Sequence, residues 1–394
     1  MRRVAALLLT CLLLAGCGAQ TEPVAEPQPE PPRTLHIIEP TAPEPAAEPE
    51  KTAAEKLLAE MSDADKVAQL FIIRPEQLDG AAKTEVTDAL REAVKAYPVG
   101  GFALFAQNIV TPGQTAALNA ELAAACAVAP ILAVDEEGGL VARLANNPAF
   151  DVPRFESTLS LETPENAYAA ADAIGGYLRE YGFNMDFAPV ADVNTNPDNP
   201  VIGSRAFGDE PAAVSQMVRA YLDGLHAHGI IGSIKHFPGH GDTKSDTHTG
   251  FVAVDKTWDE LLDCELIPFR ENFENCDTVM VAHITMRGVT DDGLPATLSP
   301  AIVRDKLRGE LGYDGVVVTD SMEMGAITQT YGAAEAAVLA VEAGCDLILL
   351  PLDFHAAYDA VLDAVQSGRI REDRLNESVL RILTLKERYG MIGE

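Results

Sequence analysis

Residues 212–237 read AAVSQMVRAYLDGLHAHGIIGSIKHF, and they contain the unit that the rest of the chain repeats. The first part has helical length and ends at Gly229, a residue type that commonly terminates helices. The second part, IGSIKHF (231–237), is a nearly continuous apolar run with Lys235 and His236 close to its end. Such runs are typical of parallel strands buried on both faces. The stretch therefore predicts a helix followed by a buried strand with polar residues at its carboxyl end.

Seven more apolar runs of this kind occur, and amphipathic stretches such as TAALNAELAAACA (115–127) lie between them. The predicted strands are VAQLFII (67–73), GGFALF (100–105), PILAVD (130–135), NMDFAPV (184–190), IGSIKHF (231–237), TVMVAH (278–283), GVVVTD (315–320) and DLILLP (346–351). Strand–helix alternation repeated eight times favours an α/β fold, a TIM (β/α)8 barrel that forms a single catalytic domain over residues 51–394. On pattern alone an open doubly wound sheet stays an alternative, although no glycine-rich phosphate loop opens a helix.

Charged or polar side chains stand at the carboxyl ends of five consecutive predicted strands. They are Asp135, Asp186 with Asp192, Lys235 with His236, His283, and Asp320. One charged residue after a strand is common, but five strands in succession indicate a functional rim, because barrel enzymes place their active sites at this end.

The loop KHFPGHGDTKSDTHTG (235–250) holds three of the eight histidines. Pro238 and Gly239 interrupt any helix here, so the i,i+4 spacing of two of the histidines does not aim both rings at one metal ion. A plain surface loop is one alternative. A barrel metallohydrolase is another, and its candidate ligands are His236, His240, His248, His283 and Asp320.

Acid–base chemistry is the third reading of this loop. Asp246 and His248 are two residues apart, so in an extended backbone the carboxylate can accept a hydrogen bond from one ring nitrogen. That bond fixes the tautomer and leaves the other nitrogen for a substrate. Asp320 follows VVVT at a strand tip, where a carboxylate can attack an electrophilic carbon. The alternative for Asp320 is an N-cap of the next helix.

Several motifs in order along the chain resemble glycoside hydrolase family 3, in its β-N-acetylhexosaminidase branch. The loop KHFPGHGDTKSDTH (235–248) is similar to the signature of that branch. The supporting motifs are VDEEGGLVARL (134–144), NMDFAPVADV (184–193), IGSRAFG (202–208), ELIPFR (265–270) and VVVTDSMEMGA (316–326). The resemblance implies a TIM-barrel enzyme that uses no cofactor or metal and releases terminal β-linked N-acetylglucosamine through a covalent glycosyl-aspartate.

The resemblance also implies roles for single residues. Asp320 matches the nucleophile, His248 matches the general acid/base and Asp246 matches its dyad partner. The residues that match those binding the hydroxyls of the sugar are Asp135, Arg143, Arg205, Lys235 and His236. We expect the glycine-hinged loop to act as a lid that brings His248 over Asp320 and holds it away without substrate.

Two departures from the family pattern lie in one motif. Glu136 stands where the family often has Gln, and Leu140 stands where it often has Arg. We expect these changes to alter subsite preferences.

The N-terminal residues predict an exported lipoprotein. In residues 1–16, Arg2 and Arg3 precede the apolar run VAALLLTCLLLAG, as in a signal peptide. The following LAGC (14–17) resembles a bacterial lipobox, which implies that Cys17 is lipidated and anchors the protein to the extracytoplasmic face of the cell membrane. Residues 18–50 contain nine prolines and seven glutamates, so residues 17–50 are predicted to be a linker. An ordinary cleaved signal is the alternative.

Composition narrows the set of partners. The formal charge of −31 makes nucleic acid a poor partner, so none is expected. The family resemblance implies a carbohydrate as the partner. The cysteines after the lipobox show no CxxC spacing and predict no disulfide scaffold: Cys126, Cys264, Cys276 and Cys345.

For an exported enzyme of this branch we expect peptidoglycan fragments as substrate, with chito-oligosaccharides as the alternative. Phosphorolysis, or sugar binding without catalysis, are the rival functions.

Overall fold

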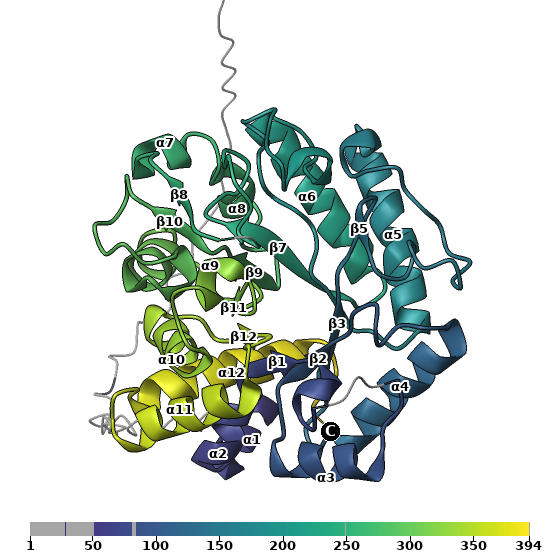
Figure 1. Ribbon diagram of the computed structural model, residues 1–394, viewed down its shortest axis with the longest axis vertical. Helices are drawn as coiled ribbons and strands as arrows, with labels where there is room; N and C mark the ends of the chain where they lie inside the picture. The colour runs from purple at the N-terminus through teal and green to yellow at the C-terminus, as the bar shows by residue number, and fades with distance from the viewer. Residues whose placement is uncertain (1–27, 29–50, 81–83, 249, 394) are drawn as a thin grey trace, which may run out of the picture. The chain divides into compact units, whose positions relative to one another are not determined.

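Eight short parallel strands form a nearly closed barrel at the centre of the protein (Figure 1). The structure is a computed structural model, and it describes residues 28, 51–80, 84–248 and 250–393. The strands are β1 (Phe71–Ile73), β2 (Gly101–Ala103), β3 (Ile131–Val134), β6 (Met185–Asp186), β7 (Ile231–Phe237), β9 (Thr278–Val281), β11 (Val316–Thr319) and β12 (Ile348–Leu349). They follow the order β11-β9-β7-β6-β3-β2-β1-β12. A parallel bridge from Val318 to Leu347 joins the two end strands, so the predicted TIM barrel is confirmed and the open sheet is wrong.

Each predicted strand contains one of the observed barrel strands. Strand β7 spans the whole of its predicted run, and the other strands are shorter than theirs. The residues of these strands are buried throughout, as expected where helices cover the outside and side chains fill the inside. The first predicted strand (67–73) was wrong at its start, because Val67, Ala68 and Gln69 belong to helix α2 (Asp63–Gln69). The Ser62 hydroxyl accepts from Asp65 N–H and closes a capping box there, a start signal that the apolar run obscured.

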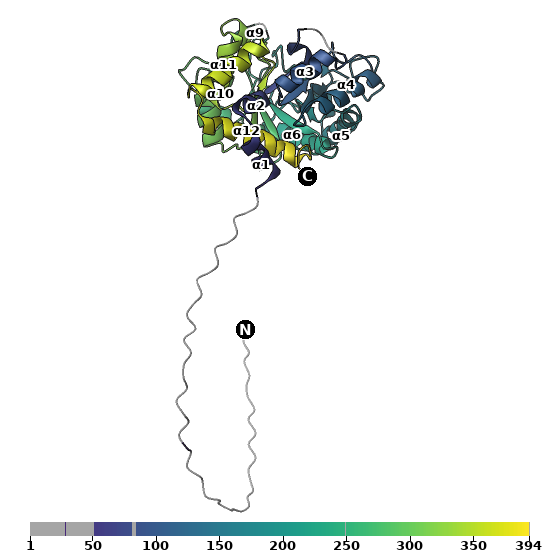
Figure 2. The same cartoon turned by 90° about the horizontal axis from the view of Figure 1, so that it is seen from below.

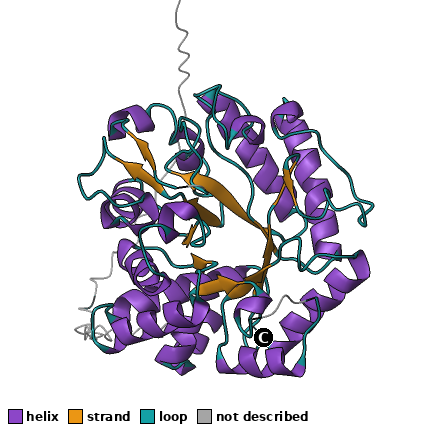
Figure 3. Cartoon of the chain, viewed as in Figure 1, coloured by secondary structure: helices purple, strands orange, loops and turns teal. Residues whose placement is uncertain are grey.

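Helices surround the strands on the outside (Figure 3). The α-helices besides α2 are α1 (Ala53–Glu60), α3 (Asp88–Ala96), α4 (Pro112–Ala125), α5 (Pro164–Glu180), α6 (Pro211–His226), α7 (Trp258–Leu262), α8 (Ile267–Arg270), α9 (Gly325–Thr328), α10 (Ala333–Ala343), α11 (Phe354–Gln366) and α12 (Glu372–Arg388). Short 3-10 turns are η1 (Pro75–Gln77), η2 (Leu159–Leu161), η3 (Gly203–Arg205) and η4 (Ala296–Leu298), and η5 (Ala301–Glu310) is a π-helix. Helix α6 ends three residues before Gly229, which has a φ of 66° and turns the chain into β7, as predicted.

Two small sheets stand apart from the barrel. Strands β4 (Glu136–Gly138) and β5 (Val141–Ala142) pair antiparallel directly after β3. Strands β8 (Val252–Val254) and β10 (Ile284–Met286) pair parallel after β7 and β9. Both sheets follow the carboxyl ends of barrel strands, so they belong to the end of the barrel at which the candidate site lies.

The first and last helices of the described domain lie side by side, as Figures 1 and 2 show. The Glu387 carboxylate in α12 accepts from the backbone N–H of Ala53 in α1 at 2.9 Å. Within the described residues, no helix is both long and apolar enough to cross a bilayer. Cys17, the predicted signal peptide and nearly all of the predicted linker lie outside the described residues. The other four cysteines named above are free thiols, as predicted.

Candidate active site

A cavity of about 450 Å³ opens at the carboxyl ends of the barrel strands. Seven of the eight residues predicted for the site line it: Asp135, Arg143, Arg205, Lys235, His236, His248 and Asp320. Asp246 is not in the lining, but it contacts His248. Of the other rim residues, Asp186, Asp192 and His283 lie behind the lining. The barrel topology therefore brings together residues up to 185 positions apart, from Asp135 to Asp320.

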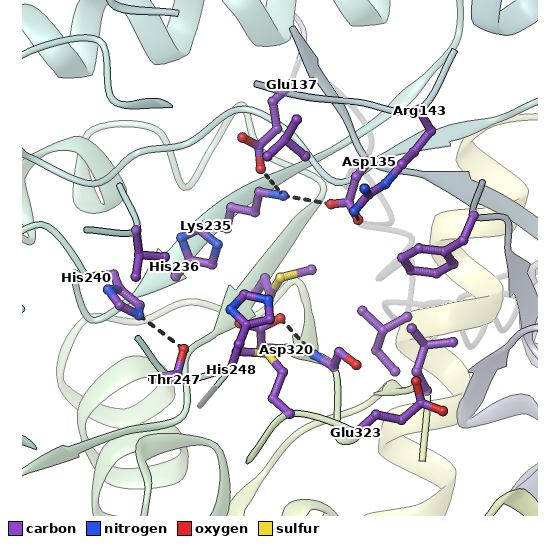
Figure 4. A pocket seen from close by; sticks show the side chains of 18 of the residues that line it. Asp135, Glu137, Arg143, Lys235, His236, His240, Thr247, His248, Asp320 and Glu323 are labelled. Carbon is purple, nitrogen blue, oxygen red and sulfur yellow. Dashed lines mark hydrogen bonds and ion pairs between the residues drawn. The ribbon is translucent and has the colours of Figure 1, made fainter. Parts of the chain in front are cut away.

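A buried ionic cluster forms one side of the cavity (Figure 4). The Lys235 ammonium lies 2.9 Å from an Asp135 oxygen and 2.6 Å from a Glu137 oxygen. Arg205 donates from Nε and Nη2 to the two oxygens of Glu137, at 2.9 and 2.7 Å. Burial opposes ionisation of Glu137, but Arg205 and Lys235 outweigh it and hold its pKa well below the usual range. Burial likewise opposes the charge on Lys235, and Asp135 and Glu137 raise its pKa. The cluster stays charged and presents oriented donors and acceptors.

The His236 ring is oriented by a carboxylate behind it. Asp192 is fully buried and accepts from His236 Nδ1 at 2.7 Å and from His240 N–H at 2.6 Å. The proton therefore sits on Nδ1, which leaves Nε2 on the side of Arg205, 3.4 Å from Nη2. Burial would raise the pKa of Asp192, but the contacts with His236 and His240 lower it below its usual value. Asp192 thus sets which nitrogen of His236 faces the cavity.

Asp320 directly follows β11 and is half-buried in the cavity wall. Its Oδ1 accepts from the backbone N–H of Ser321 at 2.7 Å. Burial alone would raise its pKa, but the His236 and His283 rings, the Ser321 N–H and Lys235 bring the pKa below 3.8. The carboxylate is therefore ionised at neutral pH, the form that acts as a nucleophile. The alternative prediction, that Asp320 is the N-cap of the next helix, is wrong, because α9 begins only at Gly325 and Met324 is its N-cap.

Asp246 and His248 form the predicted pair. One Asp246 oxygen accepts from His248 Nδ1 at 2.7 Å and from His248 N–H at 2.8 Å. Partial burial opposes it, but these two hydrogen bonds lower the pKa of Asp246. The bond to Nδ1 leaves Nε2 of His248 for the cavity. The His248 side chain is 62% exposed, in contrast to the buried cluster around Lys235.

The loop that carries this pair is docked on the segment after Asp320. Backbone N–H groups of Gly325 and Ala326 donate to the carbonyls of His248 and Thr247, at 3.2 and 3.0 Å. His248 lies in the lining of the same cavity as Asp320, so the structure has the loop over the cavity. Lid motion stays a prediction.

The histidines of the metal alternative have separate protein partners. The His240 ring contacts the hydroxyls of Thr243 and Thr247, at 2.8 and 3.3 Å. His283 Nε2 donates to the Ser321 carbonyl at 2.9 Å, and Nδ1 lies 2.8 Å from the Thr297 hydroxyl. Across the described residues, no three His, Cys, Asp or Glu side chains are grouped to hold a metal ion. His240 ties two residues of its own loop together and so stabilises the conformation of that loop.

The two departures from the family pattern lie outside the cavity lining. Glu136 is fully buried and accepts from the backbone N–H groups of Leu144 and Ala145 and from the Tyr177 hydroxyl. Leu140 is 74% exposed at the turn between β4 and β5. Glu136 thus holds the β4–β5 region in place rather than facing a substrate.

Sequence reasoning missed Glu137, Arg74, Phe105 and Glu323, which all line the cavity. Glu137 could have been predicted, because it is two residues after Asp135 and residues i and i+2 of an extended segment face the same side. Arg74 could also have been predicted, because it directly follows the first barrel strand, at the end where the site lies. Glu323 lies in a quoted motif, but its partner comes from a segment 249 positions away in the chain.

Comparisons with known proteins agree with this geometry. Residues 63–385 match the model of the glycosyl hydrolase family 3 N-terminal domain. Beta-hexosaminidase A of Pseudoalteromonas piscicida is 33% identical over 338 residues, which are 78% of this chain and 56% of that protein. Beta-hexosaminidase LpqI of Mycobacterium tuberculosis is 33% identical over 336 residues, 83% of each chain. A solved family 3 beta-N-acetylglucosaminidase from Paenibacillus sp. str. FPU-7 superimposes with a TM-score of 0.79 at 42% identity, covering 85% of this chain and 64% of that one.

Proposed function

Because the chain belongs to glycosyl hydrolase family 3, we propose that it is a retaining exo-β-N-acetylglucosaminidase. The observation that carries the proposal is one cavity lined by the ionised Asp320 carboxylate, the His248 ring and the buried ionic cluster around Lys235. The names of the relatives, beta-hexosaminidase and beta-N-acetylglucosaminidase, support the choice of sugar.

The cluster around Lys235 binds the terminal sugar in this proposal. Lys235, Arg143 and Arg205 donate to sugar oxygens, and the Asp135 carboxylate accepts from neighbouring hydroxyls. His236 adds its Nε2, whose orientation follows from the Asp192 contact. A terminal sugar enclosed by these groups fits an exo-acting enzyme.

The reaction then runs in two displacements. Asp320 attacks C1 while protonated His248 gives its proton to the leaving oxygen, and a glycosyl-Asp320 ester forms. Neutral His248 next takes a proton from water, which attacks C1 and releases the sugar with its configuration retained. Asp246 keeps the ring in one tautomer and stabilises the imidazolium, through the 2.7 Å contact to Nδ1.

Trapping of the covalent intermediate tests this proposal directly. A fluorinated β-GlcNAc analogue slows the second displacement, and peptide mass spectrometry then locates the label. We expect the label on the peptide that contains Asp320. A label on a peptide without Asp320 would overturn the assignment of the nucleophile.

Phosphorolysis is the rival reaction, because phosphate can replace water as acceptor of the glycosyl group. Rates and products in the presence and absence of phosphate distinguish the two, and hydrolysis predicts free N-acetylglucosamine in both. Turnover of a β-GlcNAc aryl glycoside would also eliminate the second rival, a sugar-binding protein without catalysis.

We further propose that Cys17 is lipidated and tethers the domain outside the cytoplasmic membrane, through the linker of residues 17–50. The LAGC pattern at residues 14–17 supports this placement. At that location, peptidoglycan fragments are the expected source of terminal β-linked N-acetylglucosamine. Metabolic labelling with an alkyne fatty acid checks the anchor, and Cys17→Ser is expected to abolish the label.

A further inference from the structure

The segment Asp320–Ala326 carries the proposed nucleophile at one end and the docking site of the lid at the other. Asp320 N–H donates to the Val281 carbonyl and Met322 N–H donates to the Leu349 carbonyl, at 3.0 and 2.9 Å, which fixes the first half to the barrel. At the far end, Gly325 and Ala326 hold the lid by the two backbone hydrogen bonds described above. The distance between nucleophile and acid/base therefore depends on the conformation of this short segment.

Glu323 lies in the middle of that segment and is held by Arg74, which is 249 positions away in the chain. Arg74 donates from Nη1 and Nη2 to the two Glu323 oxygens, at 2.6 and 2.5 Å. The two side chains are only 18% and 27% exposed. A bidentate, partly buried pair of this kind is stronger and more directional than an ordinary surface ion pair.

Arg74 is itself held from the first two strands of the barrel. It directly follows β1, and its Nε lies 2.9 Å from a Glu76 oxygen. Glu76 in turn accepts from the side-chain amides of Gln107 and Asn108, both at 3.0 Å. The Arg74 guanidinium also lies 5.9 Å from the centre of the Phe105 ring. These contacts hold the Arg74 side chain in position independently of its pairing with Glu323.

We propose that the Arg74–Glu323 pair is a positioning device that sets the register between Asp320 and the docked His248. It ties the loops after β1 and β2 to the segment that joins the nucleophile to the lid. Neither side chain takes part in the chemistry above, and the inference rests on the proposed glycosidase function. Loss of the pair lets Gly325 and Ala326 shift, and the lid shifts with them.

Two aryl β-GlcNAc glycosides test the inference, one with a good leaving group and one with a poor leaving group. Only the poor leaving group needs the proton from His248. For Glu323→Gln and for Arg74→Met we expect kcat/KM to fall about 10- to 100-fold with the poor leaving group, because small displacements of reacting groups are costly. With the good leaving group we expect a fall of only about 3-fold. The double variant should be no worse than either single variant.

The matched control is Glu342→Gln, which breaks a bidentate pair of similar geometry. Arg369 donates to Glu342 from Nε and Nη2 at 3.0 and 2.8 Å, away from the active-site cavity. We expect both glycosides to be hydrolysed by this variant at the parental rate. The melting temperature of every variant is measured alongside.

The outcomes separate the inference from its competitors. Equal losses on both glycosides together with a lower melting temperature would mean a merely structural pair and overturn it. A rise in KM for one aglycone alone would mean direct substrate contact and also overturn it, as would no effect at all. A folded parent protein that turns over neither glycoside contradicts the proposed function itself, and the inference falls with it.

Discussion

The two sides of the active-site cavity are built in opposite ways. The Lys235 side is a buried ionic cluster in which Lys235 is 2% exposed and Glu137 is 3% exposed. The His248 side stands on a loop, and its ring is 62% exposed with one carboxylate as partner. Buried charges need partners that long-range folding supplies, whereas an exposed pair two residues apart needs only a local turn. In the proposed mechanism, the residues that recognise the sugar therefore belong to the barrel, and the residue that transfers the proton lies on a separate loop.

The largest loss of activity is expected at Asp320, because in the proposed mechanism its carboxylate attacks C1 of the sugar that the two sides of the cavity hold and protonate. Asp320→Asn removes the nucleophile and leaves the cluster and the lid in place, so we expect kcat to fall on the order of 10⁴-fold or more. Steady-state kinetics with an aryl β-GlcNAc glycoside measures this fall. Parental activity in this variant would refute the covalent route.

The lid side should lose activity without losing stability. His248→Ala is expected to lower kcat/KM for a poor leaving group by about 10²- to 10⁴-fold, which is the usual contribution of general acid–base catalysis. The melting temperature should hardly change, because the side chain is mostly exposed. Asp246→Asn serves as the companion variant and should lose less, since the imidazole itself remains. A large drop in melting temperature for His248→Ala would contradict the comparison.

The cluster side should lose stability as well as affinity. Glu137→Gln leaves two buried cations, Lys235 and Arg205, without the carboxylate between them, and breaking a buried pair costs about 3–5 kcal/mol. Denaturant unfolding measures the loss, and KM should rise in the same variant. Glu92→Gln is the control, because its pair with Lys95 is 74% and 66% exposed and should contribute less than about 1 kcal/mol.

A buried cation with a neutral partner sharpens the comparison further. Lys386 is fully buried and donates to Gln69 Oε1 at 2.8 Å, and burial lowers its pKa from 10.5 to about 7. The unfolded chain then binds more protons than the folded one between pH 7 and 10.5, so this lysine makes stability rise with pH across that window.

Removal of this lysine should have the smallest effect of the set. Lys386→Met ends the desolvation cost but leaves Gln69 Oε1 without its donor, so we expect a net gain of about 2 kcal/mol at pH 6. The gain should shrink as the pH approaches 10. Denaturant unfolding of parent and variant at several pH values checks it, and a gain independent of pH would show that Lys386 does not titrate in this range.

The sequence alone determined the order of the elements and most of the site. Each apolar run contained a barrel strand, because strands buried on both faces must be apolar along their whole length. Asp135, Lys235, His236 and Asp320 were predictable from their places at strand ends, where a barrel collects its functional groups. The contact of Asp246 with His248 was predictable because it spans two residues.

Only the tertiary structure decided the partners that come from distant parts of the chain. The pairing of Glu137 with Arg205, of His236 with Asp192 and of Arg74 with Glu323 joins residues 44 to 249 positions apart in the chain. Such contacts depend on the closure and register of the barrel, which no local pattern encodes. Residues 67–69 are a different case, because the local capping box of Ser62 and Asp65 starts a helix that extends into the apolar run. Local chemistry could be inferred from the sequence, whereas the three-dimensional packing of the barrel determines which charges neutralise one another.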